Sequence, residues 1–170
     1  MKRRDFIQSA AVSGLLLSSP FALAQPKVSP PKFSLQGTNV AGKKIGLQDY
    51  AGHTVLLSFF TIDCEVCNHD IKLMREFYVR NMNKKFILIG VNLDQNKKEL
   101  DEYNDITTLG YPKNQRFPTV WRNAVGHNDN FGKITTTPTH FVLDPKHQLM
   151  FKREGAFLPD DWDKLWLSMG

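Results

Sequence analysis

Cysteine is scarce in this chain, and its scarcity counts against two common kinds of site. Only Cys64 and Cys67 occur among 170 residues. Structural zinc needs about four ligands, usually from a second C-x-x-C or an H-x3–5-H pair, and the five histidines do not have that spacing. Covalent haem attachment needs histidine directly after the second cysteine, where this chain has Asn68. We therefore expect no metal and no haem at this pair.

Long apolar runs and a basic stripe are also missing. The apolar part of the N-terminal region, Ala10–Leu17, is shorter than the roughly 20 residues of a transmembrane helix. The net charge is +5, but the basic residues are scattered and are not interleaved with aromatic ones, so nucleic-acid binding has little support. The length and a hydrophobic content of 41% are typical of one compact domain.

Residues 1–24 are typical of an export signal. A basic start precedes the uncharged segment Ser9–Ala24, and Ala22-Leu23-Ala24 is a small-x-small cleavage site. Arg3-Arg4-Asp5-Phe6-Ile7 is similar to a twin-arginine signal, with an ordinary secretory signal and an uncleaved anchor as the alternatives. We expect cleavage after Ala24, delivery to the periplasm and no stable membrane span afterwards.

Hydrophobic patterns predict an exposed leader at 25–32, rich in Pro, Ser and Lys, and then a domain at 33–170. Phe33–Gln36 and Lys44–Leu47 alternate as the strands of a β-hairpin do. The continuous apolar runs Val55–Phe60 and Phe86–Val91 are typical of central strands buried on both faces. Between these runs, apolar residues at helical spacing predict an amphipathic helix that reaches about Met82; they are Ile71, Met74 and Tyr78.

The second half of the domain is less regular. We expect a short helix at Lys97–Asn104, then loops with one or two short helices between Thr107 and Lys133, where Pro, Gly and Asn are frequent. Thr139–Leu143 and Gln148–Lys152 predict a strand pair, and Pro159 begins a last helix. The order ββ, βαβα, ββα predicts an α/β sandwich. Several aromatic residues are expected in its core: Phe59, Phe60, Phe141, Trp162 and Trp166.

The buried strand leads directly into Cys64-Glu65-Val66-Cys67, which begins the first helix. Two thiols at this spacing can form and break one disulfide. At a helix N-terminus, unpaired N–H groups and the helix dipole lower a cysteine pKa from about 8.5, so Cys64 is the predicted nucleophile. Cys67, one turn inward, would be buried and would resolve the mixed disulfide. A structural clasp is the alternative, although so small a ring restricts the unfolded chain little.

This arrangement resembles the thioredoxin fold, and specifically the TlpA/ResA-like envelope thiol-disulfide oxidoreductases. The resemblance covers Phe33 to the C-terminus and rests on the C-x-x-C motif after a buried strand, with three further segments downstream: Phe131–Ile134, Thr137–Asp144 and Gly155. It implies a three-layer sandwich with a mixed central sheet, an N-terminal β-hairpin extension and a C-terminal helix. It also implies no cofactor beyond a redox-active Cys64–Cys67 disulfide.

The resemblance implies roles for residues around the cysteines. A cis Thr137-Pro138 peptide would lie against the dithiol, where the Thr137 backbone could pair with an extended substrate. Asp70, at the position of a common family glutamate, could relay protons to Cys67, with a solvated helix-face acid as the alternative. Glu65 is a possible modulator, with an exposed motif residue as its alternative.

Asp63 and Val66 depart from the family pattern, which has Trp before the first cysteine and Pro before the second. The acids Asp63 and Glu65 flank Cys64 and disfavour a thiolate, so we expect a reductant rather than a strong oxidant. Its partners would be a thiol protein of the envelope, with apocytochrome c as one candidate, and an upstream electron donor.

Three other functions are weighed against this one. A copper chaperone of the SCO type would use both cysteines and His140, but that family has three residues between its cysteines. A peroxidase-like redoxin usually has a Pro-x-x-x-Thr segment before its cysteine, which this chain lacks. A pure binding module would show no thiol exchange.

Overall fold

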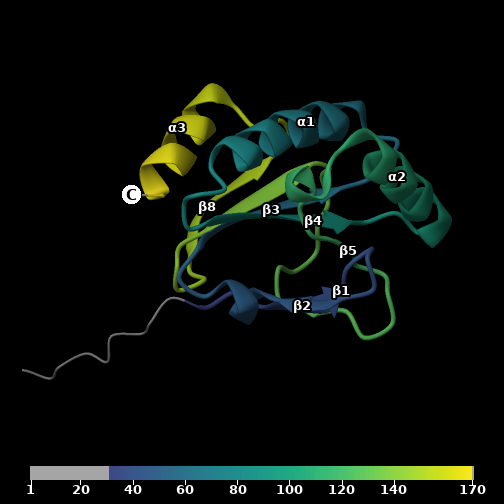
Figure 1. The fold of residues 1–170 in the computed structure, drawn as a ribbon. Coiled ribbons are helices and arrows are strands. Elements are labelled where there is room, and N and C mark those ends of the chain that lie inside the picture. The colour runs from purple at the N-terminus through teal and green to yellow at the C-terminus, as the bar shows by residue number, and fades with distance from the viewer. Residues whose placement is uncertain (1–30, 170) are drawn as a thin grey trace, which may run out of the picture.

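The computed structural model describes residues 31–169 (Figure 1). The predicted export signal at 1–24 and nearly all of the predicted leader at 25–32 lie outside these residues. Within residues 31–169, none of the helices has the length and apolar character needed to cross a membrane.

A five-stranded mixed sheet forms the centre of the molecule, in the order β5-β4-β3-β7-β8. Strands β3, β4 and β5 are parallel, whereas β7 runs antiparallel to both β3 and β8. Every residue of β3 and β4 is buried, as the continuous apolar runs predicted. The strands are β3 Thr54–Phe60, β4 Phe86–Asn92, β5 Thr119–Trp121, β7 Thr139–Leu143 and β8 Leu149–Glu154.

Three layers result, because each face of the sheet is covered by a different kind of element. The helices α1, α2 and α3 lie on one face, and β1 and β2 lie on the other (Figure 1). Alternate residues of β3 contact the two layers: Leu56 and Phe60 pack with the helices, and Leu57 and Phe59 with the smaller sheet. The helices are α1 Glu65–Arg80, α2 Lys97–Gly110 and α3 Pro159–Ser168. This confirms the expected α/β sandwich.

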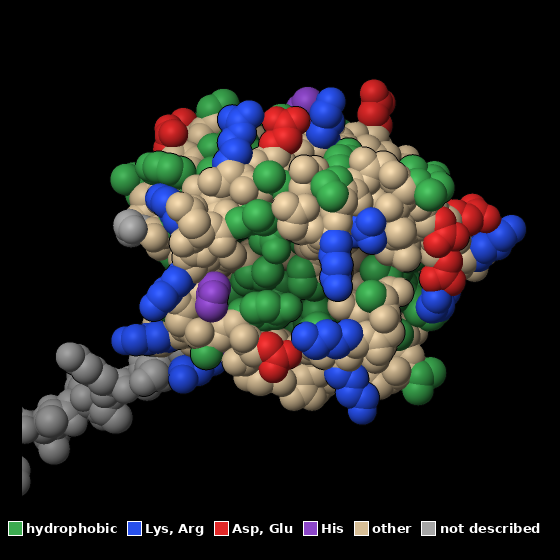
Figure 2. All heavy atoms as spheres, in the orientation of Figure 1, with side chains coloured by type: hydrophobic (Ala, Val, Ile, Leu, Met, Phe, Trp, Pro, Cys, Tyr) green, Lys and Arg blue, Asp and Glu red, His purple; other side chains and the backbone are tan. Residues whose placement is uncertain are grey.

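The predicted N-terminal hairpin is confirmed as β1 Leu35–Thr38 and β2 Lys44–Gly46. It is extended by β6, Asn128–Asp129, into a three-stranded antiparallel sheet in the order β2-β1-β6. Figure 2 shows hydrophobic side chains in a hollow between the helix layer and this smaller sheet, with lysine, arginine, acidic and histidine side chains around it. One short 3₁₀ helix, η1 at Leu47–Tyr50, connects the hairpin to β3.

Two parts of the sequence-based prediction were wrong. Helix α2 continues to Gly110, and the expected loops before Lys133 contain the 3₁₀ helix η2, Lys113–Gln115, and also β5 and β6. Strands of three and two residues are too short to show an alternating pattern. Trp166 is not in the core: it is 51% exposed, and Lys84 Nζ lies 3.8 Å from its ring centroid.

Asp129 connects the small sheet to the chain that leads into β7. Both of its carboxylate oxygens accept from Arg122, at 2.7 Å each, and His127 Nε2 donates to it at 2.8 Å. Burial by itself would raise the pKa of Asp129, but the hydrogen bonds from His127, Arg122 and the Phe131 amide hold that pKa well below its usual range. Arg122 also donates to the Gly132 carbonyl. The ionised carboxylate of Asp129 therefore links Arg122, His127 and the segment around Gly132.

Asp129→Asn should therefore lower the free energy of unfolding by about 2 kcal/mol at pH 7, because charge-assisted hydrogen bonds are lost. A carboxyl whose pKa is lowered in the folded state makes its full contribution to the free energy of unfolding above the ordinary aspartate pKa of about 3.9. That contribution decreases as the pH falls below this value. The difference between wild type and variant should thus shrink between pH 4 and pH 2 in urea unfolding followed by tryptophan fluorescence. A difference in unfolding free energy that stays constant between pH 4 and pH 2 would contradict the lowered pKa of Asp129.

Candidate functional site: a disulfide at the start of helix α1

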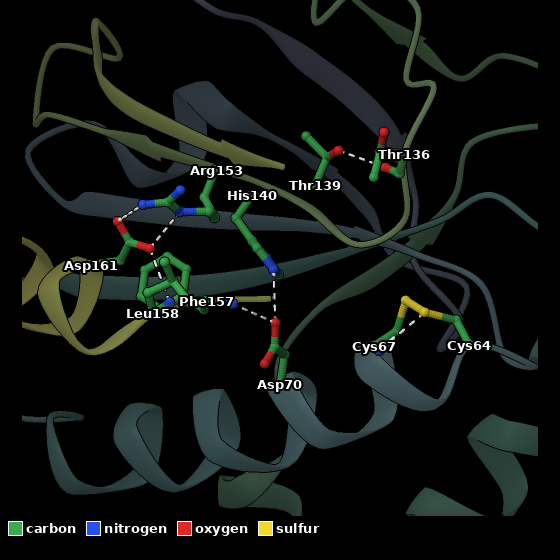
Figure 3. A network of polar contacts seen from close by, with 10 residues as sticks. All are labelled: Cys64, Cys67, Asp70, Thr136, Thr139, His140, Arg153, Phe157, Leu158 and Asp161. Carbon is green, nitrogen blue, oxygen red and sulfur yellow. Dashed lines mark hydrogen bonds and ion pairs between the residues drawn. A yellow bond between two sulfur atoms is a disulfide. The ribbon is translucent and has the colours of Figure 1, made fainter. Parts of the chain in front are cut away.

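The two cysteines form a disulfide at the N-terminus of α1 (Figure 3). Cys64 is the N-cap residue and Cys67 lies in the first turn, where its backbone N–H donates to Cys64 Sγ at 3.1 Å. Cys67 is fully buried, whereas Cys64 is partly exposed. Cys64 is therefore the more accessible of the two residues, and the helix directs an amide donor at its sulfur.

The loop before Cys64 is held by a residue that sequence reasoning missed. Asp94 is 7% exposed, and its Oδ2 accepts from the Ile62 amide at 3.0 Å and from Asn92. Its backbone carbonyl accepts from Trp121 Nε1 at 2.7 Å, so Trp121 also anchors this loop. A signal was present: Asn92 ends β4, and the carboxyl ends of the parallel strands β3 and β4 meet at one edge of the sheet.

Asp70 lies one turn beyond Cys67 on the same buried face of α1, and its side chain is directed at His140 on β7 (Figure 3). It is 1% exposed, which excludes the solvated helix-face acid considered above. Its Oδ2 accepts from the Phe157 amide at 2.8 Å and from His140 Nε2 at 3.1 Å. A buried carboxylate with a histidine partner therefore lies beneath the disulfide.

Polar side chains continue across the sheet from this pair. His140 is opposite Ser58 on β3 and opposite Arg153 on β8. His140 Nδ1 and Ser58 Oγ are buried and have no hydrogen-bond partner among the described residues. Arg153 instead donates to both oxygens of Asp161 on α3, at 2.6 and 3.0 Å (Figure 3). The interior beneath the cysteines is thus polar on the helix side of β3, β7 and β8.

The structure brings Thr137 and Pro138 to the same end of the sheet as the cysteines. Thr139 at the start of β7 pairs with Phe59 near the end of β3, so the residues before Thr139 and those after Phe60 are neighbours. The Thr137-Pro138 peptide is cis, as expected. Pro138 is buried and its carbonyl accepts from the Gly155 amide at 2.8 Å, whereas Thr137 is exposed.

The remaining predicted site residue, Glu65, is exposed in the first turn of α1, as are Asp63 and Val66 beside it. Within residues 31–169 there is no cluster of three or more His, Cys, Asp and Glu side chains that could hold a metal ion. His140, the candidate copper ligand of the SCO alternative, is fully buried and hydrogen-bonded to Asp70.

Comparison with known proteins gives matches in sequence. The model of the AhpC/TSA family matches residues 27–152. The thiol-disulfide oxidoreductase ResA of Oceanobacillus iheyensis is 24% identical over 132 residues, which are 76% of this chain and 65% of that protein. The thioredoxin-like protein YneN of Bacillus subtilis is 26% identical over 119 residues, 68% of this chain and 64% of that protein. The matched region thus covers slightly less than two thirds of the length of these relatives.

Solved structures match over a larger share of their length. A thiol:disulfide interchange protein of the thioredoxin family from Chlorobium tepidum superposes with a TM-score of 0.65 at 19% identity, covering 86% of this chain and all of that one. StoA from Bacillus subtilis gives a TM-score of 0.60 at 20% identity, covering 81% of this chain and 98% of that one. At this identity the likeness shows the fold, which is thioredoxin-like.

Proposed function

Because this chain belongs to the AhpC/TSA family and has a thioredoxin-like fold, we propose that it is a thiol-disulfide oxidoreductase that uses Cys64 and Cys67. One observation carries the proposal: the two cysteines form a disulfide at a helix N-terminus, with Cys64 partly exposed and Cys67 buried. This asymmetry fits an attacking and a resolving thiol. The names of the sequence relatives agree with this activity.

The reaction begins with the reduced protein. The Cys64 thiolate attacks one sulfur of a partner disulfide, the other partner sulfur leaves as a thiolate, and a mixed disulfide forms. Cys67 then loses its proton and attacks Cys64 Sγ, which releases the second partner thiolate and forms the Cys64–Cys67 disulfide. Two electrons pass to the partner, whose thiolates take up two protons. An upstream dithiol donor must afterwards reduce this chain again.

The Thr137 backbone is the proposed substrate contact. Its N–H and C=O make no hydrogen bond to the rest of the described chain, and Thr137 is exposed at the end of the sheet where Cys64 lies. An extended peptide could pair with these groups while its cysteine reaches Cys64. The buried Pro138 keeps this segment against the sheet through its bond from Gly155.

Asp70 is proposed as the group that accepts the Cys67 proton during resolution. Cys67 is fully buried, so water does not reach it freely, and Asp70 is the carboxylate one turn further along the same helix face. His140 holds the Asp70 carboxylate in place through a hydrogen bond from its Nε2. Arg153 and Asp161 lie nearby and form an ion pair with each other, so their charges offset one another. Glu65, which is exposed, would act on Cys64 only as a negative charge.

We further propose that the protein works as a reductant in the bacterial envelope. Asp63 and Glu65 are both exposed beside Cys64, and their charges disfavour the thiolate that strong oxidants stabilise. The envelope location rests on residues 1–24 alone, with their paired arginines and the Ala22-Leu23-Ala24 site. A thiol protein such as apocytochrome c is the class of partner that this location offers.

Replacing the resolving thiol should trap the partner. In Cys67→Ala, Cys64 still attacks but nothing releases the partner, so a mixed disulfide should accumulate on non-reducing gels and in intact mass spectra. Cys64→Ala is the matched control, because its remaining thiol is buried, and it should trap none. Both variants should lose insulin reduction to the uncatalysed background. Equal trapping by the two variants would contradict the assignment of Cys64 as the attacking thiol and Cys67 as the resolving thiol.

The reduction potential should lie near that of thioredoxin, about −270 mV, rather than near the value of about −120 mV found for the strong oxidant DsbA. The measurement equilibrates the protein with dithiothreitol and glutathione buffers and quantifies its free thiols. A value at the oxidising end would refute the reductant role and leave the thiol chemistry intact.

Asp70→Asn should slow release of the mixed disulfide about 100-fold at pH 7, a typical contribution of a general base. The defect should narrow towards pH 10, because hydroxide then competes with the carboxylate as the base and a general base contributes less. Stopped-flow measurement of partner release from pH 6 to 10 tests this, with Asp105→Asn on the exposed side of α2 as the control. A defect of equal size at every pH would mean that Asp70 acts only through packing.

A further inference from the structure

Arg75 is a buried cation without a carboxylate partner among the described residues. It lies in the middle of α1 and is 5% exposed. Its guanidinium donates to the Gln115 carbonyl at 3.0 Å and to the Tyr103 hydroxyl at 3.5 Å. It also lies over the ring of Tyr111, at 4.1 Å from the centroid, and near that of Phe117, at 4.8 Å. All of these partners are neutral.

Such an environment leaves positive charge in excess. Burying a charged group is costly unless it is paired, and buried arginines usually have an acidic partner. The two aromatic rings offset part of this cost. A guanidinium can donate five hydrogen bonds, of which Arg75 makes two within the described chain. Donors therefore remain for an anion.

Arg75 lines a pocket of about 470 Å³, a volume usual for small-molecule sites. The pocket lies at the β5 edge of the sheet, between α2 and the turn after β1, which is fixed to β5 by a hydrogen bond from the Val40 amide to the Thr119 carbonyl. Leu100 and Tyr103 form part of its wall on α2. In Figure 1 these elements lie together on the right of the molecule.

Every charged residue that lines this pocket is a cation: Arg75, Lys113 and Arg116. Arg116 is held in place by donating to the carbonyls of Tyr111 and Thr108, each at 2.8 Å, and so it too is bonded to neutral oxygens. Lys113 is exposed at the rim. Two ordered arginines and a lysine around an apolar space are complementary to a ligand with one negative group and an apolar body.

We propose that this pocket binds a small organic anion, an aromatic or aliphatic carboxylate whose charge reaches Arg75 and Arg116. The carboxylate would supply the acidic partner that Arg75 lacks, and the apolar body would lie against Leu100 and Tyr103. Neither cysteine and neither residue of the Thr137-Pro138 segment lines the pocket, so the proposal stands apart from the thiol chemistry.

The test titrates the full chain with 1-naphthoate and with its uncharged analogue 1-naphthamide, followed by amide NMR spectra. We expect saturable shifts concentrated in residues 97–119. The amide should bind about tenfold more weakly, since a charge-assisted hydrogen bond contributes at least that factor. Equal binding of the two probes, or shifts spread over the whole chain, would overturn the proposal.

Two kinds of variant locate the site. Arg75→Gln would also disturb the packing of α1, so the more exposed cations are replaced instead, in Lys113→Gln/Arg116→Gln, which should weaken naphthoate binding about tenfold or more. Thr107→Trp, on the α2 wall, should abolish binding by filling the space. Lys146→Gln removes an exposed cation at the opposite edge of the sheet and should bind as wild type does. Unchanged binding in the first two variants, or equal loss in the control, would refute the site.

Discussion

The position of Cys64 depends on the burial of β3 on both faces. Because every residue of β3 is buried between β4 and β7 and between the two outer layers, the strand cannot shift without exposing apolar surface. The chain therefore emerges at a fixed edge of the sheet, where Asp94 holds the Ile62 amide and α1 begins at once. The helix N-terminus then aims the Cys67 amide at Cys64 Sγ. The sulfur of Cys64 is thus placed by hydrophobic packing several residues away.

The interior beneath the cysteines is polar, in contrast to the apolar packing that fixes β3. Ser58 and His140 interrupt the helix-side surface of β3 and β7, and each has one buried atom without a hydrogen-bond partner in the described chain. Such atoms are costly in a protein core. Asp70 lies at the same place, whereas the next residue on this face of β3 toward its start, Leu56, is apolar. Part of this cost thus falls beside the disulfide, and within the described residues His127 and His147 each carry one further atom of this kind elsewhere.

Sequence patterns were sufficient where a property is local or periodic. The two apolar runs of β3 and β4, the helix begun by the cysteines and the proline before β7 all follow from nearby residues, and each was predicted. What was wrong or was left open depends on distant partners. Strand β5 is ordered by pairing with β4, Trp166 is exposed because α3 packs through Leu165, and the burial of Asp70 requires a histidine from β7 and an amide from the segment before α3. No window along the chain contains these pairs.

Helix α1 shows why a search for apolar periodicity misses buried charged residues. Its buried residues follow the helical repeat without a gap: Cys67, Asp70, Ile71, Met74 and Arg75. Two of the five are charged, so a search for apolar periodicity finds only the middle of the stripe. The two charges are also treated differently. Asp70 receives hydrogen bonds from a histidine and an amide, whereas Arg75 has only neutral oxygens and rings. One helix therefore presents a charge with a histidine and an amide as partners beneath the disulfide, and beside a pocket a charge whose described partners are all neutral.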